Sequence, residues 1–132
     1  NPIPRINLNY NMVGLIFGGN AIVLACLLTI AAFPETQPML LLPAIGLFGA
    51  SFPMVMAHGR AFFPAHLTGR GVTLINLFGI GTTGVMQYAT GHLHAALTPA
   101  PPNVPYIGIM LAYAGLVALG LTAYLWSKDR TD

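Results

Sequence analysis

The side chains best suited to chemistry in this chain are uncharged polar groups that recur along one apolar segment. Within residues 71–97 they follow one another at helical spacing, and they are Asn76, Thr83, Gln87, Thr90 and His94. At about 100° per residue this spacing places all five near one line along a helix. Asn76, Thr83 and Gln87 are therefore candidate lining residues of a substrate cavity. The alternative is that these groups hydrogen-bond neighbouring helices as packing contacts.

The sequence offers little else for chemistry. It contains no paired carboxylates, no Ser–His–Asp set, no cluster of cysteine with histidine and no phosphate-binding glycine loop. His92 and His94 are two residues apart, so they lie on different faces of a helix, which disfavours a shared metal ion. We therefore expect no enzymatic activity, no metal and no cofactor.

The elements that must position these side chains are membrane-spanning helices. Hydrophobic residues make up 55% of the chain and charged ones 6%, whereas soluble domains carry about 25% charged residues. A hydrocarbon core of about 30 Å takes about 20 helical residues, and four apolar segments are close to this length. The sequence predicts an all-α membrane protein, one unit over residues 1–132, with four transmembrane helices at about 12–33, 39–60, 71–97 and 104–126.

The basic residues fall on one side of the four predicted spans. They are Arg5 before the first span, Arg60 and Arg70 between the second and third, and Lys128 and Arg130 after the fourth. Because Lys and Arg favour the cytoplasmic side, both termini are expected in the cytoplasm, and the protein in the bacterial inner membrane. Five cations spread over three segments are a topology signal rather than a basic patch, so nucleic acid is not expected as a partner.

Rows of small residues indicate how the spans pack. Helices in lipid associate through close contacts at Gly, Ala and Ser, so a row of these on one face predicts a helix–helix contact. The first span carries such a row in Gly14, Gly18, Ala21 and Ala25.

The segment between the second and third spans carries a resemblance to a known family. It reads His58-Gly59-Arg60-Ala61-Phe62-Phe63-Pro64-Ala65-His66-Leu67-Thr68-Gly69-Arg70-Gly71. This segment resembles the loop between the tenth and eleventh helices of the major facilitator superfamily, which reads roughly Pro-Glu-x-x-Arg-Gly-Arg after a preceding arginine. Arg60, Pro64, Gly69 and Arg70 match that pattern, and Ala65 and Thr68 replace its glutamate and first arginine. The similarity covers the whole chain, as helices nine to twelve.

The resemblance implies a secondary transporter that moves a small solute by alternating access, in which this chain is a fragment of the C-terminal half of a twelve-helix bundle. It implies that Arg60, Pro64, Gly69 and Arg70 form a cytoplasmic loop and gate, and that the second and third spans line the cavity. The expected partners are the lipid bilayer, the remaining transporter helices and a small-molecule solute. For the two arginines, the alternative is that they only fix orientation and bind lipid phosphates.

Another function class remains open beside transport. A self-contained four-helix membrane protein with a structural or scaffolding role needs no polar site, whereas a small multidrug-type exporter needs a mid-span glutamate that this sequence lacks. Further hydrophobic spans encoded upstream of Asn1 would favour the transporter, and a start codon there would favour the small protein. The uncharged polar line favours neutral or zwitterionic solutes.

Overall fold

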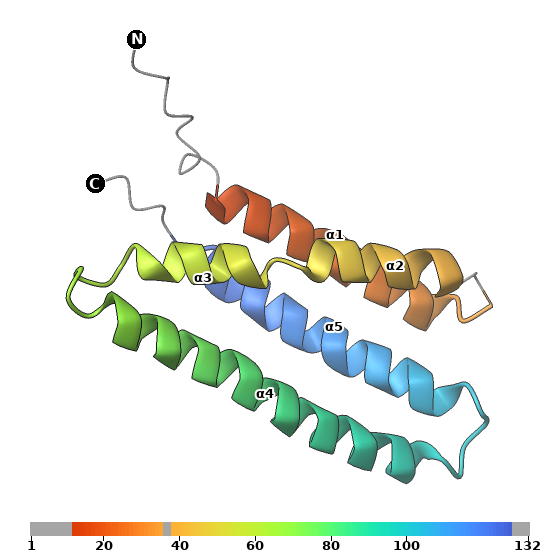
Figure 1. Ribbon diagram of the computed structural model, residues 1–132. Coiled ribbons are helices and arrows are strands. Elements are labelled where there is room, and N and C mark those ends of the chain that lie inside the picture. Colours follow the sequence, from red (N-terminus) through yellow and green to blue (C-terminus); the bar gives the residue numbers. More distant parts are fainter. Residues whose placement is uncertain (1–11, 36–37, 128–132) are drawn as a thin grey trace.

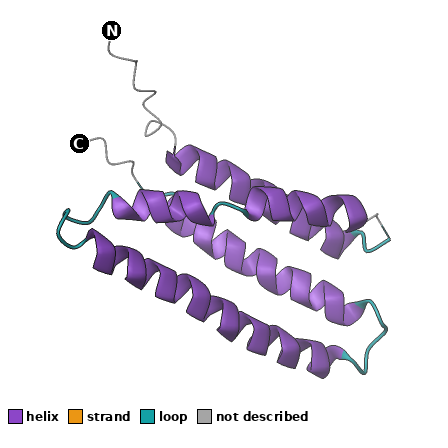
Figure 2. Ribbon diagram, viewed as in Figure 1, coloured by secondary structure: helices purple, strands orange, loops and turns teal. Residues whose placement is uncertain are grey.

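The computed structural model describes residues 12–35 and 38–127. Arg5, Lys128 and Arg130, on which part of the predicted orientation depends, lie outside the described residues. The described chain forms helices and no strand, which confirms the all-α prediction (Figures 1 and 2). The helices are α1 (Met12–Ala32), α2 (Pro38–Gly49), α3 (Phe52–Arg60), α4 (Thr68–Leu97) and α5 (Val104–Tyr124).

The helices lie alongside one another in an elongated bundle (Figure 1). α1 packs mainly against α5 and α2, and α4 packs against α5 and α3. Val23 and Leu27 of α1 meet Ala114 of α5 in the core. The start of α1, the end of α5 and the loop between α3 and α4 lie at one end of the bundle, and the turns after α1 and α4 lie at the other (Figure 1).

A break interrupts the second predicted span. α2 ends at Gly49 and α3 begins at Phe52, so the segment expected as one helix over 39–60 is two. Pro53 explains the break, because proline has no N–H to donate to the carbonyl of Gly49 and its ring crowds that carbonyl. The N–H groups of Met54 and Val55 instead both donate to the carbonyl of Ser51, at 3.0 Å, and start α3.

Three segments of the described chain are both long and apolar enough to cross a membrane. They are Met12–Ala32, Pro38–Arg60, which combines α2 and α3, and Val104–Tyr124. α4 is long enough, with 30 residues, but its glycines and polar side chains make it less apolar than the other three. Length and composition therefore support an integral membrane protein with three of the four predicted spans.

Candidate functional site

The three predicted cavity residues lie on an exposed face of α4, and apolar residues on other faces of this helix, such as Leu77 and Val85, are exposed as well. Asn76, Thr83 and Gln87 are all exposed, and the side of α4 that faces α3 and α5 is formed by other residues, such as Ile75 and Gly79. The Thr83 hydroxyl donates to the carbonyl of Gly79 in its own helix, at 3.0 Å. Neither amide has a hydrogen-bond partner among the described residues. The described helices bring the three residues together on one face but do not enclose a cavity over it.

The C-terminal end of the same polar line makes different contacts. Thr90 is half-buried and its hydroxyl donates to the carbonyl of Met86, at 2.7 Å. The ring of His94 packs edge-on against Tyr106 of α5, with the ring centroids 5.4 Å apart. Of these two residues, His94 packs against another helix, whereas the Thr90 hydroxyl bonds within α4.

The loop residues of the predicted gate lie at the end of the bundle that holds the start of α1. Arg60 is the last residue of α3, and Gly69 and Arg70 are in the first turn of α4, which begins three residues earlier than predicted. The carbonyl of Pro64 accepts hydrogen bonds from the N–H of Leu67 at 2.9 Å and from the Thr68 hydroxyl at 3.1 Å. These bonds shape the connection into α4.

Both arginines of this loop are exposed. Glu35, the one acidic side chain within residues 12–35 and 38–127, lies after α1 at the opposite end of the bundle. Within the described chain, Arg60 and Arg70 therefore have no carboxylate partner. Their guanidinium groups are available to water, to lipid phosphates or to other parts of a larger protein.

Glycines set how closely α3 and its loop approach α4. A Cβ atom at Gly59 would lie 2.5 Å from Ile75, and one at Gly79 would lie 2.7 Å from the ring of Phe52, so each helix receives a side chain of the other. A Cβ atom at Gly71 would lie 2.5 Å from the ring of Phe63 in the loop. At each of these glycines a larger residue would collide with the neighbouring side chain. The close contacts hold α3 and the loop against α4.

The predicted small-residue row of α1 is not used in this way. A Cβ atom at Gly14 or at Gly18 would meet no atom within 4 Å, and Ala25 is exposed. The buried side of α1 is formed by larger residues, among them Ile16 and Val23. The row therefore lies opposite the contact with α5, and its two glycines line a hollow beside Phe48 and Met54 instead of making a close contact.

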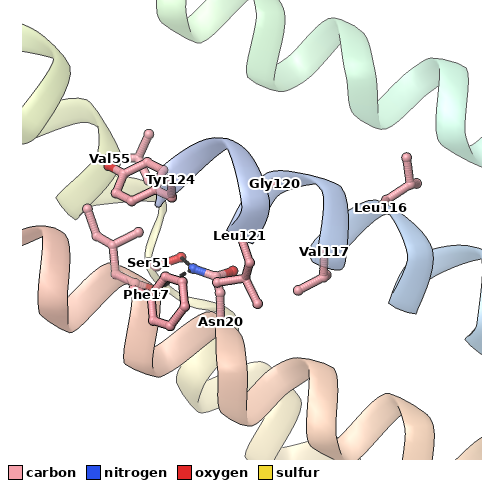
Figure 3. Close-up of a pocket in the computed structure, with 10 residues that line it drawn as sticks. Phe17, Asn20, Ser51, Val55, Leu116, Val117, Gly120, Leu121 and Tyr124 are labelled. Atoms are coloured by element: carbon pink, nitrogen blue, oxygen red, sulfur yellow. Dashed lines mark hydrogen bonds between the residues drawn. The ribbon is translucent and has the colours of Figure 1, made fainter. Parts of the chain in front are cut away.

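Sequence reasoning missed a second group of polar residues, on the opposite side of α5 from the exposed line. The amide nitrogen Nδ2 of Asn20, in α1, donates to the carbonyl of Ile16 at 2.8 Å and to the hydroxyl of Ser51 at 3.2 Å (Figure 3). Ser51 lies in the break between α2 and α3. Two features of the sequence could have indicated this contact. Asn20 is the one amide within the apolar segment 12–33, and Ser51 lies two residues before Pro53.

A second polar contact ties α3 to α5. Nδ1 of His58 and the Tyr124 hydroxyl are 2.7 Å apart, and the His58 side chain is only 7% exposed. The ring of Phe62 covers His58 edge-on, with centroids 5.2 Å apart. This contact fixes the end of α3 on the end of α5.

A cavity of about 310 Å³ lies beside these groups, where α1, α3 and α5 meet (Figure 3). Asn20, Ser51 and Tyr124 supply its polar lining, and aliphatic and aromatic side chains such as Phe17 and Leu121 supply the rest. No charged side chain of the described residues lines it. The cavity can hold an uncharged molecule with a small polar group.

No family model, curated protein or solved structure matches this chain. The arrangement of its own residues is therefore the basis for assigning a function.

Proposed function

We propose that this chain is part of a secondary transporter of the major facilitator type and contributes to the transmembrane transport of a small solute by alternating access. The observation that carries the proposal is the exposed and unpartnered pair of amides, Asn76 and Gln87, on the described part of α4. In this proposal α4 also crosses the membrane, as the third of four spans, and the chain belongs to a twelve-helix bundle.

The cost of polar groups in lipid favours this function. An amide without a hydrogen-bond partner in hydrocarbon costs several kcal/mol. A spanning helix with two such amides and a threonine on one face is stable only if that face meets water or protein. In a transporter, a solute cavity between two halves supplies both.

The chemistry of the line also limits the solute. Asn76, Thr83 and Gln87 carry no charge, so they favour a neutral or zwitterionic solute. Arg60 and Arg70 lie together at one end of the bundle, which we assign to the cytoplasmic face of the bacterial inner membrane, with both termini on the same side.

The orientation is tested by single cysteines in a background in which the native Cys26 is replaced by alanine. Glu35→Cys and Ala100→Cys should react with a membrane-impermeant maleimide added outside intact cells, and Ala65→Cys should react only after the cells are opened. Glu35 and Ala65 are both exposed, so a difference between them reports sidedness. Labelling of Ala65→Cys from outside would reverse the orientation.

The transport site is tested by Asn76→Cys, Thr83→Cys and Gln87→Cys in the full-length protein, with the same Cys26→Ala background. A thiol must ionise to react and does so poorly in hydrocarbon, so cysteines that face a water-filled cavity should react about tenfold faster than Val85→Cys or Ile75→Cys. Val85 is 66% exposed but lies on the opposite side of α4 from the line, and Ile75 packs on Gly59. Labelling at the three positions should fall when a transported solute is present.

Two outcomes would contradict the proposal. Reaction rates equal to that of Val85→Cys would show that the line meets no water. Disulfide cross-links between Gln87→Cys residues of two copies would show that a second copy covers the line, as a self-contained membrane protein with a structural role requires.

A further inference from the structure

The cavity between α1, α3 and α5 has a polar region formed by Asn20 and Ser51. The hydrogen bonds there leave one acceptor and one donor without a partner among the described residues. Nδ2 of Asn20 carries two hydrogens, and both are used, by the carbonyl of Ile16 and by the Ser51 hydroxyl oxygen. The side-chain oxygen of Asn20 remains as an acceptor, and the hydroxyl hydrogen of Ser51 remains as a donor. Within the described chain neither has another partner.

The helix break explains why this polar end exists in an apolar region. Pro53 cannot donate to the carbonyl of Gly49, and the backbone N–H of Ser51 has no hydrogen-bond partner among the described residues. Irregular backbone within a membrane is tolerated where it is buried in protein or borders a polar cavity. The Asn20–Ser51 pair supplies part of that polar surrounding, and a bound polar group can supply the remainder.

We infer that this cavity binds an uncharged molecule that carries a hydroxyl group on an aliphatic chain. A hydroxyl both donates and accepts, so one such group bonds to the Asn20 oxygen and the Ser51 hydroxyl together. The apolar walls, formed by Phe17, Val117 and Leu121 among others, accommodate the chain. A volume of about 310 Å³ lies within the range of small-molecule sites. This site is separate from the line on α4 and does not depend on transport.

Photolabelling with a diazirine derivative of octanol tests the site, with the diazirine of the corresponding alkane as the matched probe without a hydroxyl. The full-length protein is reconstituted in phospholipid nanodiscs, irradiated and mapped by mass spectrometry. The alcohol should label residues of α1, α3 and α5 around the cavity, and excess octanol should suppress this labelling. The alkane should label the same residues less.

Two glycines of α5 provide a matched pair of variants. A Cβ atom at Gly120 or at Gly115 meets no atom within 4 Å, but only Gly120 lines the cavity. Gly120→Leu should fill part of the cavity and remove most of the alcohol labelling, because its side chain occupies the space that the bound molecule needs. Gly115→Leu should leave the labelling unchanged.

Ser51→Ala separates the hydroxyl site from general lipid contact. Loss of one hydrogen bond should lower alcohol labelling about fivefold and leave alkane labelling unchanged. The inference is overturned if Ser51→Ala lowers both probes equally, if Gly120→Leu and Gly115→Leu behave alike, or if the label spreads over the exposed face of α4. None of these results depends on the accessibility of Asn76 or Gln87. Photolabelling can therefore contradict the alcohol site without contradicting the proposed transport, and cysteine labelling of α4 can do the reverse.

Discussion

Pro53→Ala should join α2 and α3 into one uninterrupted helix. Alanine restores the N–H that donates to the carbonyl of Gly49 and removes the ring that crowds it, a difference of about 3 kcal/mol in a helix interior. Amide hydrogen exchange at Ser51 and Phe52 should then slow by about 100-fold, since that is the factor that corresponds to about 3 kcal/mol of added local stability. Exchange measured by mass spectrometry on the peptide around Ser51 provides the test.

Pro43→Ala is the matched control for this prediction. Pro43 lies inside α2, which continues past it without a break. Its replacement should leave exchange at Ser51 unchanged. If Pro53→Ala also leaves it unchanged, the contact between Asn20 and Ser51 causes the break, and proline does not.

Gly71→Leu should destabilise the protein by about 2 kcal/mol or more, a typical effect of overpacking a close contact. Gly71 is buried, and even its Cβ would lie 2.5 Å from the Phe63 ring. That ring must leave its position, and the loop that joins Arg60 to Arg70 must move with it. Unfolding in a titration with sodium dodecyl sulfate measures the change in free energy.

Gly69→Leu serves as the control, because a Cβ at Gly69 meets no atom within 4 Å and the residue is exposed in the same turn of α4. It should change the unfolding free energy by no more than about 0.5 kcal/mol, as other surface substitutions do. Equal effects of the two variants would show that glycine is needed in this turn for its backbone and not for the contact with Phe63.

Hydropathy located the apolar segments, but it did not locate the break. Pro43 and Pro53 lie in the same predicted span, and only Pro53 lies at an interruption of the helix. Proline is tolerated inside membrane helices when neighbouring groups compensate for the lost hydrogen bond. At the interruption beside Pro53, Ser51 makes a tertiary contact with Asn20 of α1, and no pattern in the second span reveals that contact.

The candidate site shows a similar division. Helical periodicity placed Asn76, Thr83 and Gln87 on one line, and the structure places all three on one exposed face of α4. Periodicity alone could not show that His94, on the same line, packs on Tyr106. The side that a helix turns toward its neighbours depends on the shapes of those neighbours, and these lie elsewhere in the sequence.

The same limit explains the small-residue row of α1. Its spacing predicted a close contact, yet α1 meets α5 through large residues that fit around Ala114. Here the small residue that allows close approach is on the partner helix. One such position on either helix is enough for close packing, so a row on one helix does not identify its contact face.

The extensive contact between α1 and α5 has a consequence for biosynthesis. α1 is the first described helix to leave the ribosome and α5 is the last, so α1 enters the membrane well before the helix against which its buried face packs. Asn20 likewise enters before Ser51 has been translated. Until Ser51 has been made, the Asn20 amide lacks this partner in the membrane, whereas lipid covers the apolar surface around Val23 until α5 arrives. A chain stalled before Ser51 would present this amide as the mark of an incomplete product to membrane proteases.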